Sequence, residues 1–259
     1  MKKYSAVYLA PAIFLLFASL CTSISRAQAP PPTHNGAPSP AQRAQQYSKI
    51  AKLPDWAGIW VLDFGPVPGV REEAPVLRPT AEAQLKINLA DEAKNLPPPS
   101  ESANCLPPGM PTIMFQPYDV EFLFTPGRVT IIQEAYMQVR RVFTDGRGHP
   151  AHLDPTFNGH SIGHWEGDTL VVDTVGLGHR TPLGYHELMH GPHLHVIERI
   201  HLIAPDKMED DMTLIDPDVL VKPWHEAHTF TRHRDWDQIE YICEENNRNQ
   251  IENGQIKPF

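Results

Sequence analysis

Histidine is the residue type with the greatest chemical potential in this sequence. The chain contains 14 histidines among 259 residues, and most of them fall between His149 and His233. Imidazole titrates near neutral pH and is the commonest metal ligand in proteins, so this concentration can supply acid–base or metal chemistry. The alternative is a surface whose charge varies with pH, because protonated imidazoles would offset the net negative charge of the chain.

One candidate acid–base site lies in a polar run that covers two expected strands. His160 and His164 are four residues apart, so an extended strand places both imidazoles on one face. Asp173 follows on the next expected strand. Charged residues inside other expected strands could also pair across the sheet, namely Glu121, Glu134, Arg141 and Glu198, and Arg141 could pair with Glu134 or Asp173. Paired inside a barrel, these groups would form an acid–base or anion-binding site; the alternative places them on a solvated outer face.

A second candidate is a metal site formed by His190, His193 and His195. His193 and His195 are two residues apart, so a strand would turn both imidazoles to one face, where they could chelate a divalent metal such as zinc. His190 would add a third nitrogen. The alternative is a set of exposed or half-buried imidazoles. Residues 186–190 also spell HExxH, but the prolines and glycines around them leave little room for the helix that a zinc peptidase needs.

Composition excludes several classes of protein. The chain has 22 Lys and Arg against 31 Asp and Glu, which argues against a nucleic-acid partner. Hydrophobic residues make up 41% of it, too many for a disordered chain. After residue 27 no apolar stretch is long enough to span a bilayer. The expected partner is therefore a small-molecule ligand or substrate.

Residues 1–27 have the pattern of a secretory signal peptide. Lys2 and Lys3 precede an apolar run over residues 6–20, and small residues at Ser25 and Ala27 favour cleavage after Ala27. The predicted location is therefore periplasmic or secreted.

Removal of the signal peptide would leave two cysteines, Cys105 and Cys243. In an oxidising compartment we expect them to form a disulfide, although two unpaired buried thiols are the alternative. The bridge would close a loop of about 140 residues, which the loop-entropy model values at up to ~4–5 kcal/mol.

The remaining pattern predicts one domain over residues 52–248, between a disordered Pro-rich linker (28–51) and a flexible tail (249–259). A helix is expected over residues 78–95, with Thr80 as its N-cap. Short strands joined by sequential hairpins favour an all-β fold, an antiparallel up-and-down barrel with this one N-terminal helix. The expected strands cover residues 58–62, 118–125, 129–136, 138–143, 162–165, 169–175, 195–203, 211–214, 227–234 and 238–244.

Two resemblances add to this interpretation. The run 154–176, DPTFNGHSIGHWEGDTLVVDTVG, resembles the signature of a widespread family of secreted bacterial proteins, and segments 105–111, 144–147 and 241–246 match the same family. This resemblance covers most of residues 55–248 and implies secretion but no particular activity. Gly58-Ile59-Trp60 resembles the Gly-x-Trp of lipocalin-like (calycin) barrels, which implies a barrel that encloses a cavity.

Two functions follow from these expectations. The first is a secreted small-molecule enzyme (a lyase, hydrolase or isomerase) with a His/carboxylate acid–base site or a metal site in the barrel. The second is a non-catalytic carrier of an apolar ligand. Converging imidazoles, arginine and carboxylates around a cavity would favour the enzyme. A cavity lined by apolar side chains would favour the carrier, and the side chains expected there are Phe122, Phe124, Ile131 and Val142.

Overall fold

The computed structural model describes residues 39–65, 67, 73–96, 105–178, 181–246, 251–252 and 255–256. The chain divides into two compact units, residues 1–39 and residues 40–259, and the following concerns the second. The predicted signal peptide and residues 28–38 of the predicted linker lie outside the described residues. In the part of the chain that is described, no helix is long and apolar enough to cross a membrane.

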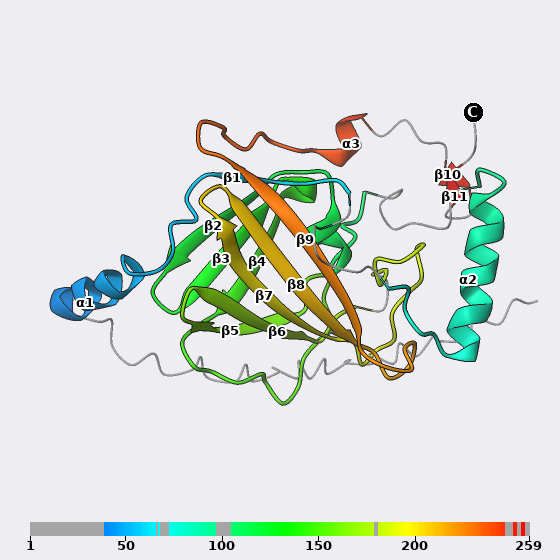
Figure 1. Ribbon diagram of the computed structural model, residues 1–259, viewed down its shortest axis with the longest axis horizontal. Coiled ribbons are helices and arrows are strands. Elements are labelled where there is room, and N and C mark those ends of the chain that lie inside the picture. Colours follow the sequence, from blue (N-terminus) through cyan, green and yellow to red (C-terminus); the bar gives the residue numbers. More distant parts are fainter. Residues whose placement is uncertain are drawn as a thin grey trace, which may run out of the picture. The chain divides into compact units, whose positions relative to one another are not determined.

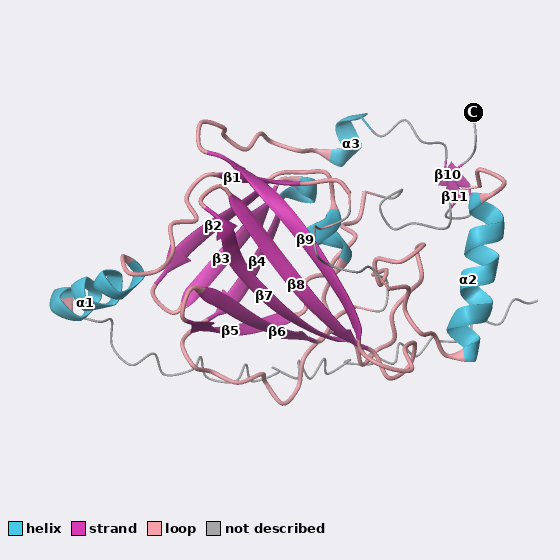
Figure 2. Ribbon diagram, in the orientation of Figure 1, coloured by secondary structure: helices cyan, strands magenta, loops and turns pink. Residues whose placement is uncertain are grey.

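Strands dominate the second unit, and the few helices lie outside the sheet (Figures 1 and 2). In chain order the elements are α1 (Pro40–Ile50), β1 (Ile59–Leu62), α2 (Pro79–Glu92), η2 (Thr112–Phe115), β2 (Val120–Thr125), β3 (Arg128–Gln133), η3 (Ala135–Met137), β4 (Gln138–Phe143), β5 (His160–Glu166), β6 (Thr169–Val175), β7 (His195–Ala204), β8 (Lys207–Ile215), β9 (Trp224–His233), α3 (Cys243–Asn246), β10 (Ile251–Glu252) and β11 (Gln255–Ile256).

Strands β1 to β9 close into a barrel in sequence order, and β9 returns to pair with β1 (Figure 1). Closure leaves no unpaired edge strand. The prediction of an all-β barrel is confirmed. The pairing is antiparallel except between β4 and β5, which run parallel and pair only at Val142–Ser161 and Phe143–Ile162. The expectation of a wholly antiparallel barrel is wrong there, because the long connection over residues 144–159 carries the chain back before β5 starts.

Alternation along the strands decides which side chains fill the barrel. On β8 every second residue is buried, and the residues between them are half-buried. Large apolar side chains such as Trp60 and Phe230 occupy the interior. Phe122, Ile131 and Val142, three of the four residues expected to line a carrier cavity, are at most 5% exposed and belong to this packed core. None of the four cavities that we describe is lined by these three residues.

Among the described residues, two helices of more than ten residues, α1 and α2, form outside the barrel, where one helix was expected. α2 confirms the predicted helix, but Thr80 is not its cap: Arg78 holds the N-cap position without a side-chain hydrogen bond, and Pro79 begins the helix. α1 lies in the segment predicted to be a disordered linker. Its alanines, glutamines and arginine have high helix propensity, and this outweighs the prolines before it, although none of its residues is buried.

The C-terminal part also departs from expectation in two places. Residues 238–242 form no strand, and residues 243–246 form the short helix α3. The Gln238 side chain, and not a strand ladder, links this segment to the barrel by donating to the backbone carbonyls of Asp119 and Ile132. Within the predicted flexible tail, β10 and β11 pair as a two-stranded hairpin.

Cys105 and Cys243 form the predicted disulfide, which joins positions 138 residues apart in sequence. It links the segment that leads into η2 to the segment that follows β9. The predicted pairing is therefore confirmed.

Candidate functional site

Three predicted site residues meet on the outer face of the barrel. His160 begins β5, Asp173 lies near the end of β6, and His195 begins β7, so the antiparallel register brings them to one end of three neighbouring strands. The residue that follows each of them in sequence is buried inside the barrel, so alternation turns these three outward. The connection between β4 and β5 adds a fourth residue, His149, which the sequence pattern did not single out.

Hydrogen bonds join the four side chains into a chain that ends at a free ring nitrogen. Oδ1 of Asp173 accepts from Nε2 of His195 at 2.7 Å and from Nε2 of His149 at 3.1 Å. Nδ1 of His149 lies 2.9 Å from Nδ1 of His160. In a neutral His149 that nitrogen is bare, so Nδ1 of His160 donates to it. Nε2 of His160 is then unprotonated, and it has no hydrogen-bond partner among the described residues.

The surroundings of His160 favour its neutral form. Burial lowers the pKa of His160, and nearby positive charge, from His149 when it is protonated and from Arg147, lowers it further. At neutral pH the imidazole is therefore unprotonated and able to accept a proton. Phe143 stacks on the His160 ring at a centroid distance of 5.5 Å, and the Arg147 guanidinium lies 4.0 Å from the Phe143 ring centre.

A cavity of about 370 Å³ adjoins His160 where β4 and β5 diverge. Its lining includes His160, Asn158 and Arg141, and the Arg141 side chain lies on the exposed outer face of β4. Over the described ranges the Arg141 guanidinium has no ion-pair or hydrogen-bond partner. A base and an unpaired cation therefore border the same cavity, an arrangement suited to an anionic molecule.

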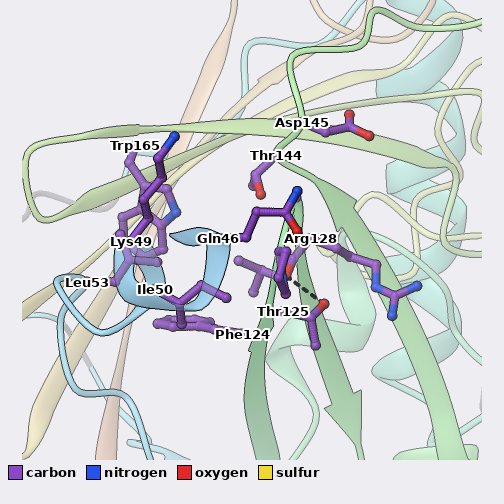
Figure 3. A pocket seen from close by; sticks show the side chains of 13 residues that line it. Gln46, Lys49, Ile50, Leu53, Phe124, Thr125, Arg128, Thr144, Asp145 and Trp165 are labelled. Carbon is purple, nitrogen blue, oxygen red and sulfur yellow. Dashed lines mark hydrogen bonds between the residues drawn. The ribbon is translucent and has the colours of Figure 1, made fainter. Parts of the chain in front are cut away.

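The larger cavity, about 620 Å³, lacks such an arrangement. It lies between α1 and the turn from β2 to β3 (Figure 3), and its lining combines apolar residues such as Ile50 and Phe124 with Lys49 and Asp145. Figure 3 shows side chains from α1 facing Phe124 and Thr125 across it. No imidazole lines this cavity in the part of the chain described.

Comparisons with models of known protein families and with curated proteins give no match. The geometry of the site therefore carries the functional argument.

Two predicted catalytic residues lie outside the His–Asp cluster, which consists of His149, His160, Asp173 and His195. His164 is on the same face of β5 as His160, but its side chain is 65% exposed and pairs with Glu166 at 3.1 Å. Glu134 is the N-cap residue of η3, and its carboxylate accepts the backbone N–H of Ile239 at 3.4 Å. Burial raises the pKa of Glu134. Neither residue contacts the cluster in the structure as described.

The predicted three-histidine metal site is not formed. His190 is buried and hydrogen-bonds Thr181 and the carbonyl of Gly191, whereas His193 is exposed and pairs with Asp218 at 2.8 Å. The three imidazoles do not converge because β7 begins only at His195, so strand alternation does not extend back to His193. In the described ranges no group of three or more His, Cys, Asp or Glu side chains is placed to hold a metal ion.

The HExxH letters do not form a zinc-peptidase helix either. His186 and Glu187 both have left-handed backbone angles, with φ of 45° and 51°. A helix that would present both histidines on one face is therefore absent over this segment.

A charged network lies inside the barrel, but its arginine is Arg140 and not the expected Arg141. Arg140 on β4 runs across the inner wall and donates to Ser161, to Thr174 and to both carboxylate oxygens of Glu198. Arg140 is 2% exposed and Glu198 is fully buried. Arg141, predicted for such a network, faces outward instead. The alternation of side-chain direction along β4 could have distinguished Arg140 from Arg141, because Arg140 shares its face with the buried Val142.

Beside this pair lies Asp210 on β8, a buried carboxyl group whose two oxygens have no hydrogen-bond partner. Burial raises the pKa of Asp210 well above its usual value, and the nearby Glu198 raises it further. The protonated form is therefore the one that the fold accommodates. Since the folded-state pKa exceeds the unfolded one, the contribution of Asp210 to stability is full below about pH 3.9 and is lost as the pH rises through the folded pKa.

We expect Asp210→Asn to leave the free energy of unfolding nearly unchanged at pH 4 and to raise it at pH 8 by at least about 1 kcal/mol, since asparagine carries no charge to bury. Urea unfolding at the two pH values measures the difference. Asp211→Asn is the matched control, because Asp211 alternates to the outer face. Equal destabilisation of Asp210→Asn at both pH values would contradict the argument.

Proposed function

We propose that this protein is a secreted small-molecule enzyme in which His160 acts as a general base on an anionic substrate. The observation that supports this most strongly is the hydrogen-bonded chain from Asp173 through His149 to His160, which ends at the cavity that Arg141 also lines. A neutral imidazole beside an unpaired guanidinium fits proton abstraction from a small carboxylate, as a lyase or isomerase performs it. A hydrolase would use the same base on water.

Each residue of the cluster has a separate role in this proposal. Nε2 of His160 takes the proton, and the resulting imidazolium keeps its Nδ1–H directed at His149. Asp173 holds His149 in the required tautomer and stabilises the positive charge that develops. His195 fixes the Asp173 carboxylate from the other side. Arg141 binds the anionic group of the substrate.

The compartment and the finer fold belong to the same proposal. The disulfide is compatible with the periplasmic or extracellular location that the signal sequence predicts. Trp60 of the Gly-x-Trp segment is fully buried on β1, which supports a lipocalin-like relationship, whereas the parallel β4–β5 pair departs from an up-and-down order.

A carrier of an apolar ligand is the second candidate, but the packing of Phe122, Ile131 and Val142 into the core favours the enzyme. Elemental analysis of the purified protein tests the separate expectation of a divalent metal.

Proton abstraction can be tested without knowledge of the product. We expect the mature protein to catalyse exchange of carbon-bound hydrogen for deuterium in at least one member of a panel of small keto and hydroxy acids, followed by proton NMR in D₂O. His160→Gln should lower this rate by about 10²–10⁴-fold, the usual contribution of a general base. The rate should rise with pH through a pKa below 6.5, because only the neutral imidazole accepts a proton.

His164→Gln is the matched control, since it removes an outward imidazole from the same strand without touching the cluster. Its exchange rate should equal that of the wild type. The same rate in His160→Gln as in the wild type, or no exchange with any member of the panel, would contradict the proposed proton abstraction from carbon.

A further inference from the structure

A cavity of about 320 Å³ at the start of β9 shares no lining residue with the cavity beside His160. Trp224, Glu226 and His228 face it from β9, and they oppose residues of β8 that point into the barrel. This cavity therefore adjoins the barrel interior. Its volume lies within the range of small-molecule sites. The full lining is Glu73, Ala74, Tyr185, Trp224, His225, Glu226, Ala227 and His228.

The lining combines aromatic rings with carboxylates. Tyr185 and Trp224 meet edge to face at a centroid distance of 5.6 Å. Nε1 of Trp224 donates to the backbone carbonyl of Glu73 at 2.7 Å, which fixes the orientation of the indole. Among the described residues that line this cavity there is no lysine or arginine. Lys222 lies 3.9 Å from the Glu73 carboxylate, but it lines an adjoining cavity instead.

The described ionisable groups of the barrel interior behind the cavity add no net positive charge. Asp210 opposes His228 across the β8–β9 pair, and neither of its oxygens is hydrogen-bonded. The Glu226 carboxylate lies 3.7 Å from Nε2 of His228. The buried guanidinium of Arg140 is already committed to Glu198. A positive charge placed in this cavity would therefore meet the negative charge of the Glu226 and Glu73 carboxylates in the lining and no opposing charge from these interior groups.

We propose that this cavity binds a small organic cation of the alkylammonium class, with its charge among the Trp224 and Tyr185 rings and the Glu226 carboxylate. Aromatic faces attract a cation through the ring quadrupole, and a nearby carboxylate supplies a charged partner. This site is independent of the base chemistry assigned to His160.

The test is a calorimetric titration of the mature protein with n-butylammonium chloride, with n-butanol and sodium butyrate as the neutral and anionic matches at equal ionic strength. We expect saturable binding of n-butylammonium alone. Glu226→Gln and Trp224→Leu should each weaken it by roughly tenfold or more. Trp224→Phe keeps an aromatic face and should retain most of the affinity.

Two further variants separate a binding effect from a folding effect. Glu73→Gln removes a lining carboxylate but keeps the backbone carbonyl that holds Trp224, so it should weaken binding while the melting temperature stays unchanged. Glu209→Gln removes a carboxylate from the outer face of β8 and should bind as the wild type does. The proposal is overturned if butanol or butyrate binds as well as butylammonium, if butylammonium shows no saturable binding, or if Glu226→Gln binds it with unchanged affinity.

Discussion

Replacing Arg140 by methionine is expected to destabilise the folded protein by about 3–5 kcal/mol, the usual cost of breaking a buried ion pair from one side. The substitution leaves the fully buried Glu198 carboxylate without its cation, and it also removes the donor shared by Ser161 and Thr174. Equilibrium unfolding in urea at pH 7 measures the loss as a lower midpoint with an unchanged slope.

Arg141→Met provides the matched control for this prediction. Arg141 is the next residue on β4 but faces outward without an ion-pair partner among the described residues, so its loss should change stability by no more than about 0.5 kcal/mol. The double variant Arg140→Met/Glu198→Leu should recover much of the stability, because it leaves no buried charge unpaired. If both arginine variants unfold at the same midpoint, Arg140 does not stabilise the fold by pairing with Glu198.

Removing the disulfide is the second substitution with a large expected effect. The variant Cys105→Ala/Cys243→Ala should lose about 2–5 kcal/mol of unfolding free energy, since the bridge closes a long loop and restricts the unfolded chain. Reductant should lower the stability of the wild type to that of the variant.

The variant itself serves as the control, because reductant should leave its unfolding midpoint unchanged. Intact mass with and without reductant, followed by alkylation, reports the bond directly. Thiols at both positions that react with the alkylating agent before reduction would contradict the pairing.

The sequence alone determined the features that depend on local pattern. Alternating apolar residues and turn residues placed most strands to within a few positions, as for the strand at Thr169–Val175, which matches its prediction at both ends. Two cysteines beyond a signal-like segment left a single possible bridge, Cys105 to Cys243. The polar run around His160 and Asp173 marked the outward-facing site, although it did not decide between the inner and outer face.

Only the tertiary structure decided which side chains meet. Side-chain direction in a strand has a period of two, so a difference of one residue separates the buried Arg140 from the exposed Arg141. His149 joins Asp173 because a long connection brings β5 in parallel to β4, and no local pattern encodes that path. His193 does not share a strand face with His195, because β7 begins two residues after His193. Register, strand ends and loop paths arise from packing around the whole barrel, and these decide the site.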